Sequence, residues 1–228
     1  MLNKKFIGNL LLLSLFLNNI FTVLSQGPLV GDLPNYPYKG KMYSGYLDLT
    51  NPKKKLHYLF VESQNDPTND PVILWLNGGP GCSSMLGWAQ EHGPAVFKPF
   101  STEWELNEYS WNKNANVIYL ESPAGVGFST IDSHDIMDWE TDDETSAEQN
   151  LDAVLDFFKR YPDFKRNDFY VAGESYGGIY VPYLASKINK YNESAPEVDK
   201  VMLKGILVGN GVTDWTVDTT PGLVDFAY

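Results

Sequence analysis

The fold is decided by one stretch of the chain, Phe169-Tyr170-Val171-Ala172-Gly173-Glu174-Ser175-Tyr176-Gly177-Gly178. Its apolar first half predicts a buried strand, and the Gly-x-Ser-x-Gly pattern that follows leads directly into a helix candidate. A serine on such a tight strand-to-helix turn is lifted clear of the sheet, and small neighbours such as Gly173 and Gly177 avoid a clash across the turn. This context predicts that Ser175 is a nucleophile. The alternative is a glycine-rich turn whose serine caps the helix.

Short apolar runs elsewhere place this turn in a sheet. Continuous apolar runs are typical of strands buried on both faces, and the chain has such runs at Val72–Leu76, Asn116–Leu120, Phe169–Ala172 and Gly205–Gly209. Helix candidates lie at about Thr145–Tyr161, ended by Pro162, and after Ser175. Upstream, Tyr43–Leu49 and Leu56–Val61 flank a turn and predict an antiparallel pair. The sequence therefore predicts an α/β fold with a mixed, mostly parallel sheet and flanking helices.

A glycine-rich loop follows the first of these buried runs: Asn77-Gly78-Gly79-Pro80-Gly81-Cys82-Ser83-Ser84. In a hydrolase of this architecture, one oxyanion-hole N–H comes from the residue after the nucleophile and another from a loop after an earlier strand. Tyr176 and Gly79 are therefore the candidate backbone donors. The loop lacks the spacing of a phosphate-binding loop, and Gly125–Ser129 lacks the third glycine of a dinucleotide-binding turn. We predict no cofactor and no metal site; the single cysteine excludes a cysteine-based zinc site.

Four blocks of the sequence occur in a recognisable order: Leu74–Ser84, Glu121–Ser129, Gly173–Gly178 and Gly209–Gly211. Together they resemble the serine carboxypeptidases, the acid-active exopeptidases of the α/β-hydrolase fold. The resemblance covers the chain from about Tyr36 to its end. It implies a peptidase that releases C-terminal amino acids through an acyl-enzyme on Ser175. By the same resemblance, Gly79 and Tyr176 match the backbone donors of the oxyanion hole.

The resemblance also implies how the substrate is held. Asn77, Gly78, Glu91 and Glu174 match the group that binds the substrate's C-terminal carboxylate, and Trp75 matches a residue that supports this group. Two ionised glutamates repel a peptide carboxylate, whereas two close carboxyl groups can share a proton at low pH and then donate hydrogen bonds to it. We therefore expect protonation of the Glu91 and Glu174 pair to confine tight binding to acidic pH.

A serine hydrolase also needs a histidine base and a carboxylate that orients this base. The three histidines, His57, His92 and His134, all precede Ser175, whereas α/β hydrolases supply serine, then acid, then histidine along the chain. We expect His92, which is nearest to the site by loop position, to be a surface or capping residue. The resemblance implies that the triad's aspartate and histidine lie beyond residue 228 and are absent from this chain.

The resemblance predicts an incomplete domain. It implies that the family's helical insertion begins after Gly209–Gly211, and that Cys82 belongs to a disulfide whose downstream partner is absent. We therefore expect residues 26–228 to be the N-terminal part of an α/β-hydrolase domain, truncated after about the sixth strand and inactive as written. The apolar strand Gly205–Gly209 would then be an uncovered sheet edge.

The N-terminus has the layout of a signal peptide. Lys4 and Lys5 precede a Leu/Phe/Ile-rich run from Phe6 to Leu24, and the small Ser25 suits cleavage after it. An uncleaved membrane anchor is the alternative. We predict a signal peptide at 1–25 and a protein of the secretory pathway, in a lysosome or vacuole or outside the cell, with no membrane contact after cleavage. Asn192-Glu193-Ser194 is the one N-glycosylation sequon.

Charge and composition limit the partners. The chain has 17 Lys and Arg against 29 Asp and Glu, a net charge of −12, which argues against nucleic acid or an anionic membrane as a partner. With 43% hydrophobic residues the chain has enough apolar material for one sizeable core and is not disordered.

The substrates expected from the glutamate pair are peptides or proteins with a free C-terminus. Two alternatives stay open: an acyltransferase or esterase on the same scaffold, and a non-catalytic pseudoenzyme that acts as a binding protein. The sequence also leaves a homodimer open.

Overall fold

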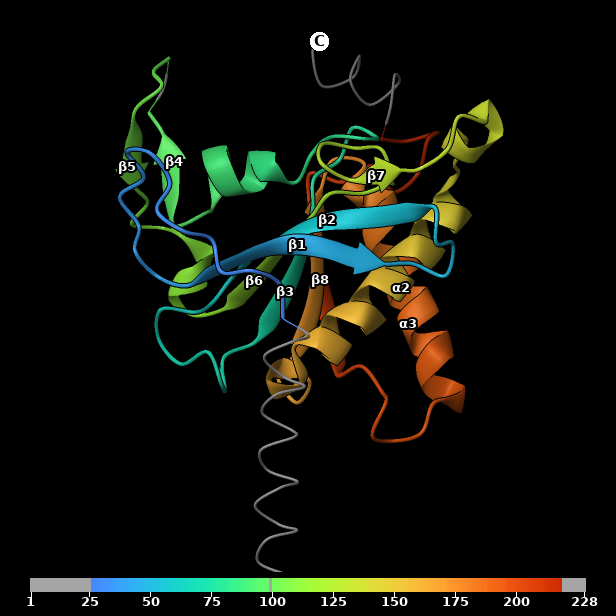
Figure 1. Ribbon diagram of the computed structural model, residues 1–228. Helices are drawn as coiled ribbons and strands as arrows, with labels where there is room; N and C mark the ends of the chain where they lie inside the picture. Colours follow the sequence, from blue (N-terminus) through green and yellow to red (C-terminus); the bar gives the residue numbers. More distant parts are fainter. Residues whose placement is uncertain (1–25, 99, 219–228) are drawn as a thin grey trace, which may run out of the picture.

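The computed structural model describes residues 26–98 and 100–218 (Figure 1). The signal peptide predicted at 1–25 lies outside these ranges and stays a prediction. The helical insertion expected after Gly211 also stays a prediction, and residues 219–228 lie outside the described ranges. Within the described ranges, no helix has both the length and the apolar character needed to cross a membrane.

The described chain folds around one large sheet with strand order β1-β2-β6-β3-β8-β9, and β7 pairs with β2 outside this path. The β1–β2 and β2–β6 pairs are antiparallel, whereas β6, β3, β8 and β9 run parallel to one another. The bounds are β1 Met42–Asp48, β2 Lys54–Val61, β3 Val72–Leu76, β6 Asn116–Leu120, β7 Thr130–Ile131, β8 Phe169–Glu174 and β9 Leu203–Gly209. The predicted mixed, mostly parallel sheet is confirmed.

Two long helices, α2 (Asp143–Arg160) and α3 (Gly177–Ser194), lie side by side on one face of this sheet (Figure 1). Asp142 caps α2 by accepting the N–H of Thr145 at 2.7 Å, so the helix begins two residues before the predicted start. The apolar faces of both helices are buried against alternate residues of the central strands, Leu74 and Ile118 among them. This packing forms the larger of two hydrophobic cores.

The opposite face of the sheet carries a second, aromatic core. Val117 and Tyr119 of β6 point to this side, whereas Ile118 and Leu120 belong to the first core, so the central strands are covered on both faces as predicted. The cover consists of short elements: the single-turn π-helix η1 (Gly87–Glu91), the hairpin of β4 (Ala95–Phe97) and β5 (Trp104–Leu106), and the 3₁₀ turn η2 (Trp111–Lys113). Two more 3₁₀ turns complete the described elements: η3 (Ile136–Trp139) and η4 (Pro162–Phe164), whose Phe164 belongs to the first core.

The last strand differs from the prediction that it is buried on both faces. In β9, Ile206, Leu207 and Val208 are 47%, 43% and 38% exposed. Among the described residues, no strand pairs with the outer edge of β9, which confirms the expectation of an uncovered sheet edge. An apolar run alone therefore could not distinguish a central strand from the last strand of this sheet.

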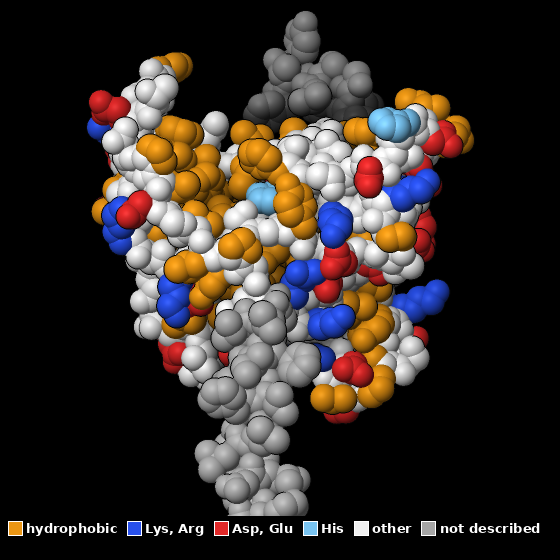
Figure 2. All heavy atoms as spheres, viewed as in Figure 1, with side chains coloured by type: hydrophobic (Ala, Val, Ile, Leu, Met, Phe, Trp, Pro, Cys, Tyr) orange, Lys and Arg blue, Asp and Glu red, His pale blue; other side chains and the backbone are white. Residues whose placement is uncertain are grey.

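Hydrophobic side chains gather on the face shown in Figure 2, beside β1 and β2 and toward β4 and β5. A cavity of about 610 Å³ opens between β1, β2 and the loop after β6. Its walls are mostly apolar and include Trp88 and Phe128, and its polar residues are Ser44 and His57.

Candidate active site

Ser175 lies between the end of β8 and the start of α3, on a turn held from both sides. Its φ of +55° is in the left-handed region, which a residue with a side chain adopts only under constraint. The Ser175 N–H donates to the Gly209 carbonyl at 3.0 Å. Its carbonyl accepts the N–H groups of Gly178 at 3.0 Å and Val212 at 2.8 Å. The turn thus presents an exposed Ser175 side chain, the geometry expected of a nucleophile elbow.

The glycines beside Ser175 are required by close backbone contacts. A Cβ at Gly173 would lie 2.6 Å from the carbonyl oxygen of Leu76, and one at Gly177 would lie 3.3 Å from the same atom. A Cβ at Gly178 would lie 2.4 Å from the Val212 carbonyl oxygen. The end of β3 and the segment after β9 therefore leave no room for a side chain at Gly173 and Gly178, whereas at Gly177 the neighbouring carbonyl would have to shift by only a few tenths of an ångström. The sequence argument for glycine is thus supported most strongly at Gly173.

The glycine-rich loop after β3 lies directly against the elbow. A Cβ at Gly78 would lie 2.5 Å from the Tyr176 backbone nitrogen and 2.8 Å from Ser175 Cβ. Gly79 has a φ of +110°, a conformation that favours glycine. The Tyr176 hydroxyl donates to Asp143 Oδ1 at 2.9 Å, which anchors that residue to α2. Gly79 and Tyr176, which the sequence predicts as oxyanion-hole donors, therefore lie in neighbouring segments.

Asn77 is the centre of the predicted substrate-binding group. Its side chain is buried, and its Oδ1 accepts two hydrogen bonds, from Trp75 Nε1 at 2.7 Å and from the Gly87 N–H at 3.0 Å. Because these two donors hold Oδ1, the side-chain nitrogen Nδ2 points to the opposite side, toward the two glutamates. Asn77 Nδ2 donates to Glu91 Oε1 and to Glu174 Oε1, each at 3.0 Å. One amide therefore bridges the two carboxyl groups.

The environment of Glu91 favours its protonated form. Partial burial raises the pKa of Glu91; the bond from Asn77 opposes this effect, and the neighbouring Glu174 carboxyl reinforces it. Glu91 is carried by η1, and Glu174 is the last residue of β8. The structure thus brings together Trp75 and Asn77 at the end of β3, Glu91 of η1 and Glu174 of β8, as the resemblance implied.

None of the three histidines makes a described hydrogen bond to Ser175. His92 is not the surface residue that we expected: it is buried, stacks on Trp111 at a ring distance of 4.1 Å and lies edge-on to Trp75 at 4.3 Å. Its backbone does close η1, so the capping alternative is correct. Burial lowers the pKa of His92 to about 4. His57 hydrogen-bonds Ser44 and Glu121.

Glu121 is a residue that the sequence analysis did not single out. It follows β6 directly and is 1% exposed. Its carboxylate lies at hydrogen-bond distance from His57 Nδ1 (2.9 Å) and the Phe128 N–H (2.8 Å), and it also accepts from the Ser83 hydroxyl. A charged residue at the end of a buried strand, followed by a glycine-containing loop, is the signal that could have revealed it, because a buried charge needs several partners.

Two further predicted sites remain predictions. Cys82 is exposed and free, at the end of the glycine-rich loop. Asn192 lies in the last turn of α3, where Nδ2 donates to the Val201 carbonyl at 2.8 Å and Oδ1 accepts the Val201 N–H at 2.9 Å. A glycan attached to Asn192 Nδ2 would have to be accommodated beside the hydrogen bond from this atom to the Val201 carbonyl.

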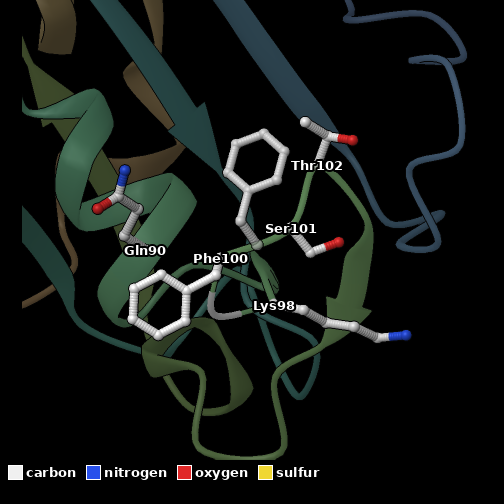
Figure 3. A pocket seen from close by; sticks show the side chains of 6 residues that line it. Gln90, Lys98, Phe100, Ser101 and Thr102 are labelled. Atoms are coloured by element: carbon white, nitrogen blue, oxygen red, sulfur yellow. The ribbon is translucent and has the colours of Figure 1, made fainter.

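A cavity of about 740 Å³ opens between η1 and the turn that joins β4 to β5 (Figure 3). Gln90, next to Glu91 in the chain, lines one side, and Phe100 and Lys98 line the other. Lys98 is already paired with Glu103 at 2.9 Å. Among its described lining residues, no hydroxyl has a side-chain base as a hydrogen-bond partner, so this cavity adds no candidate nucleophile to Ser175.

The sheet order, the elbow and the loop packed against it define an α/β hydrolase. Residues 34–228 match the family model described as serine carboxypeptidase. The chain therefore belongs to the serine carboxypeptidase family.

Known relatives show how much of such a protein this chain spans. It is 44% identical over 224 residues to serine carboxypeptidase-like 21 of Arabidopsis thaliana, covering 94% of this chain and 44% of that protein. It is 48% identical over 188 residues to the lysosomal protective protein of Mus musculus, covering 82% and 37%. The structure of the Saccharomyces cerevisiae prohormone-processing carboxypeptidase Kex1(Δ)p superposes with a TM-score of 0.73 at 27% identity, over 84% of this chain and 44% of that one. The chain thus spans less than half the length of these proteins.

Proposed function

We propose that these residues form the nucleophile and carboxylate-binding half of a serine-type carboxypeptidase, acting on peptides or proteins with a free C-terminus. The observation that carries the proposal is the bridge from Asn77 to Glu91 and Glu174, beside an exposed serine on a strained turn. A hydrolase of neutral esters needs no paired carboxyl groups at this place, whereas an exopeptidase needs donors for a terminal carboxylate. The Glu91–Glu174 pair, held in place by both N–H groups of the Asn77 amide, provides such a donor once it has taken up a proton at acidic pH.

In the proposed reaction, Ser175 Oγ attacks the carbonyl carbon of the last peptide bond. A base takes the serine proton and returns it to the departing amino acid, and water then hydrolyses the acyl-serine ester. The backbone N–H groups of Gly79 and Tyr176 would stabilise the oxyanion. The two carboxyl groups hold the substrate's terminus so that its last peptide bond reaches Ser175.

The base is the part of this reaction that the described residues do not supply. His57 and His92 are bonded to other groups, and His134 lies in the exposed segment before η3. We propose that the base and its orienting carboxylate come from residues beyond this sequence, and that residues 1–228 alone are inactive. Fluorophosphonate labelling tests this, because the reagent reacts with an activated serine. Labelling of Ser175 in the 228-residue chain would contradict the proposal of inactivity.

The pH dependence of substrate binding tests the carboxypeptidase proposal. In the complete enzyme, KM for a peptide should rise as the pH increases through the raised pKa of Glu91, because the deprotonated pair repels the substrate carboxylate. Glu174→Gln or Glu91→Gln should flatten this rise, since an amide cannot lose its proton. Glu105→Gln, at an exposed position on β5, is the matched control and should keep the wild-type profile. An unchanged profile in both site variants would reject the proposal.

We further propose that the protein follows the secretory pathway to a lysosome, a vacuole or the extracellular space. A relative named lysosomal protective protein supports this route, as does the N-terminal sequence Lys4–Leu24. Sequencing the N-terminus of the protein isolated from its cells tests it: a start near residue 26 is expected, and a start at Met1 would contradict it.

A further inference from the structure

Glu121 joins the glycine-rich loop to the opposite side of the site through a single carboxylate. We define the oxyanion loop as Gly78–Ser83. The Ser83 hydroxyl donates to Glu121 Oε1, while Oε2 accepts the Phe128 N–H at 2.8 Å and lies 2.9 Å from His57 Nδ1. Burial alone would raise the pKa of Glu121, but these hydrogen bonds outweigh it and the pKa is lowered. Glu121 is therefore an ionised acceptor in mildly acidic solution, and charge-assisted bonds of this kind are the stronger ones.

The carboxylate of Glu121 is itself closely confined. The Glu121 N–H donates to the His57 carbonyl at 3.0 Å, and the Ser129 hydroxyl donates to the Glu121 carbonyl at 2.6 Å. Ser129 Oγ also accepts the His57 N–H at 2.8 Å. Gly127 has a φ of +55°, and a Cβ there would lie 1.8 Å from Glu121 Oε1. The loop after β6 thus surrounds the Glu121 carboxylate and restricts it to the conformation that is observed.

Gly78 packs against the elbow, but residues 79–82, which follow it in the oxyanion loop, are exposed and offer little packing, so the loop needs a further anchor. Gly79 and Gly81 have φ values of +110° and +85° and are exposed. The loop is closed by the Cys82 N–H, which donates to the Gly78 carbonyl at 3.0 Å, and it is tied to α3 where the Gly81 N–H donates to Tyr180 Oη at 3.2 Å. The Ser83 bond ties it to β6.

We propose that Ser83 and Glu121 are positioning residues for acyl transfer, which hold the oxyanion loop so that the Gly79 N–H points at the developing oxyanion. This inference rests on the proposed function, because it takes Gly79 as a donor to the reacting carbonyl oxygen. Neither side chain touches the substrate. Their loss should therefore slow the chemical step and leave binding of the terminal carboxylate, which depends on Asn77, Glu91 and Glu174, almost unchanged.

The test compares Ser83→Ala with Ser83→Thr in the complete enzyme, because threonine keeps the hydroxyl. Two substrates are used: a peptide with a free C-terminus and an activated ester without a carboxylate. For Ser83→Ala we expect kcat to fall about tenfold to a hundredfold on both substrates. This is the loss of rate expected when an oxyanion-hole donor is displaced by up to about 1 Å. KM for the peptide should stay within about twofold. Ser83→Thr should recover most of the loss.

Ser44→Ala is the matched control. It removes the hydroxyl 2.8 Å from His57 Nε2, on the far side of the imidazole from Glu121, and leaves the Ser83 bond intact. Its kcat should stay within about twofold of wild type. Three results would overturn the proposal: wild-type kcat in Ser83→Ala, equal losses in Ser83→Ala and Ser83→Thr, or a loss confined to KM. A wild-type enzyme that cleaves the ester but not the peptide would refute the carboxypeptidase proposal alone, since the Ser83 comparison can still be made on the ester.

Discussion

Replacing Gly78 by alanine tests whether the oxyanion loop must touch the elbow. The added Cβ would lie 2.5 Å from the Tyr176 nitrogen, 2.7 Å from the Glu174 carbonyl oxygen and 2.8 Å from Ser175 Cβ. An ordinary contact needs about 3.4 Å, so loop and elbow would have to separate by about 0.9 Å. All three atoms are backbone or Cβ, so no flexible side chain can absorb the movement.

Both stability and rate should respond to Gly78→Ala. Overpacking of this kind costs about 1–3 kcal/mol of unfolding free energy, and in a domain of this size each kcal/mol lowers Tm by about 2–4 °C. A displacement near 1 Å between the oxyanion donors and the nucleophile costs about a hundredfold in kcat. Tm is measured by calorimetry, and kcat and KM are measured on a peptide substrate of the complete enzyme.

The control for this experiment is Gly31→Ala, because a Cβ at Gly31 would meet nothing within 4 Å. Both its Tm and its kcat should equal those of the wild type. The packing argument is refuted if Gly78→Ala also keeps wild-type Tm and kcat, since the loop would then have room that the contact distances deny.

Three further predictions concern parts of the chain away from Ser175. His92→Phe should reduce the loss of stability in acid. Histidine in the unfolded chain takes up a proton near pH 6.5, whereas folded His92 does so only near pH 4. The free energy of unfolding that is present above pH 6.5 therefore falls by up to about 3 kcal/mol as the pH drops toward 4. Urea midpoints of both proteins at pH 7 and 4.5 measure this, and parallel losses would contradict it. Gly127→Ala should lower the free energy of unfolding by about 1–3 kcal/mol, seen as a lower urea midpoint, because φ is +55° and the Cβ would clash with Glu121; an unchanged midpoint would show that the loop can move aside. Ile206→Lys should reduce self-association of the 228-residue chain through the open edge of β9, seen as a smaller mass in light scattering, whereas a wild-type chain that is already monomeric would contradict the argument.

The sheet was predictable from the sequence because its central strands are buried on both faces and therefore read as continuous apolar runs. Asn116–Leu120 and Val72–Leu76 were predicted with the bounds that the structure has. Burial of β9 was predicted wrongly, because Ile206–Val208 has the same composition as a central strand and only its neighbours in space determine its exposure. The short elements that cover the second face, such as η1, have no periodicity long enough to be recognised.

The candidate site was predictable in part. The contact between the Gly78 loop and Ser175 follows from the positions of two glycine-rich turns at the ends of neighbouring parallel strands, β3 and β8. The burial of His92 was missed because it depends on aromatic partners distant in sequence, Trp75 and Trp111. The Glu121 network was missed for the same reason, since its partners come from β2, the oxyanion loop and the loop after β6.

The buried amide of Asn77 has a consequence for the chemical lifetime of the protein. Asn77-Gly78 is the kind of pair in which the glycine backbone nitrogen can attack the asparagine side chain, release ammonia and form a cyclic imide, because glycine places no side chain in the way. In the folded chain both ends of the amide are held, by Trp75 and Gly87 on one side and by the two glutamates on the other. The attack is therefore confined to unfolded molecules, and its hydrolysed product would add a third acid between Glu91 and Glu174. Each excursion from the native state thus carries a risk of permanent damage to this site, even when the chain refolds afterwards.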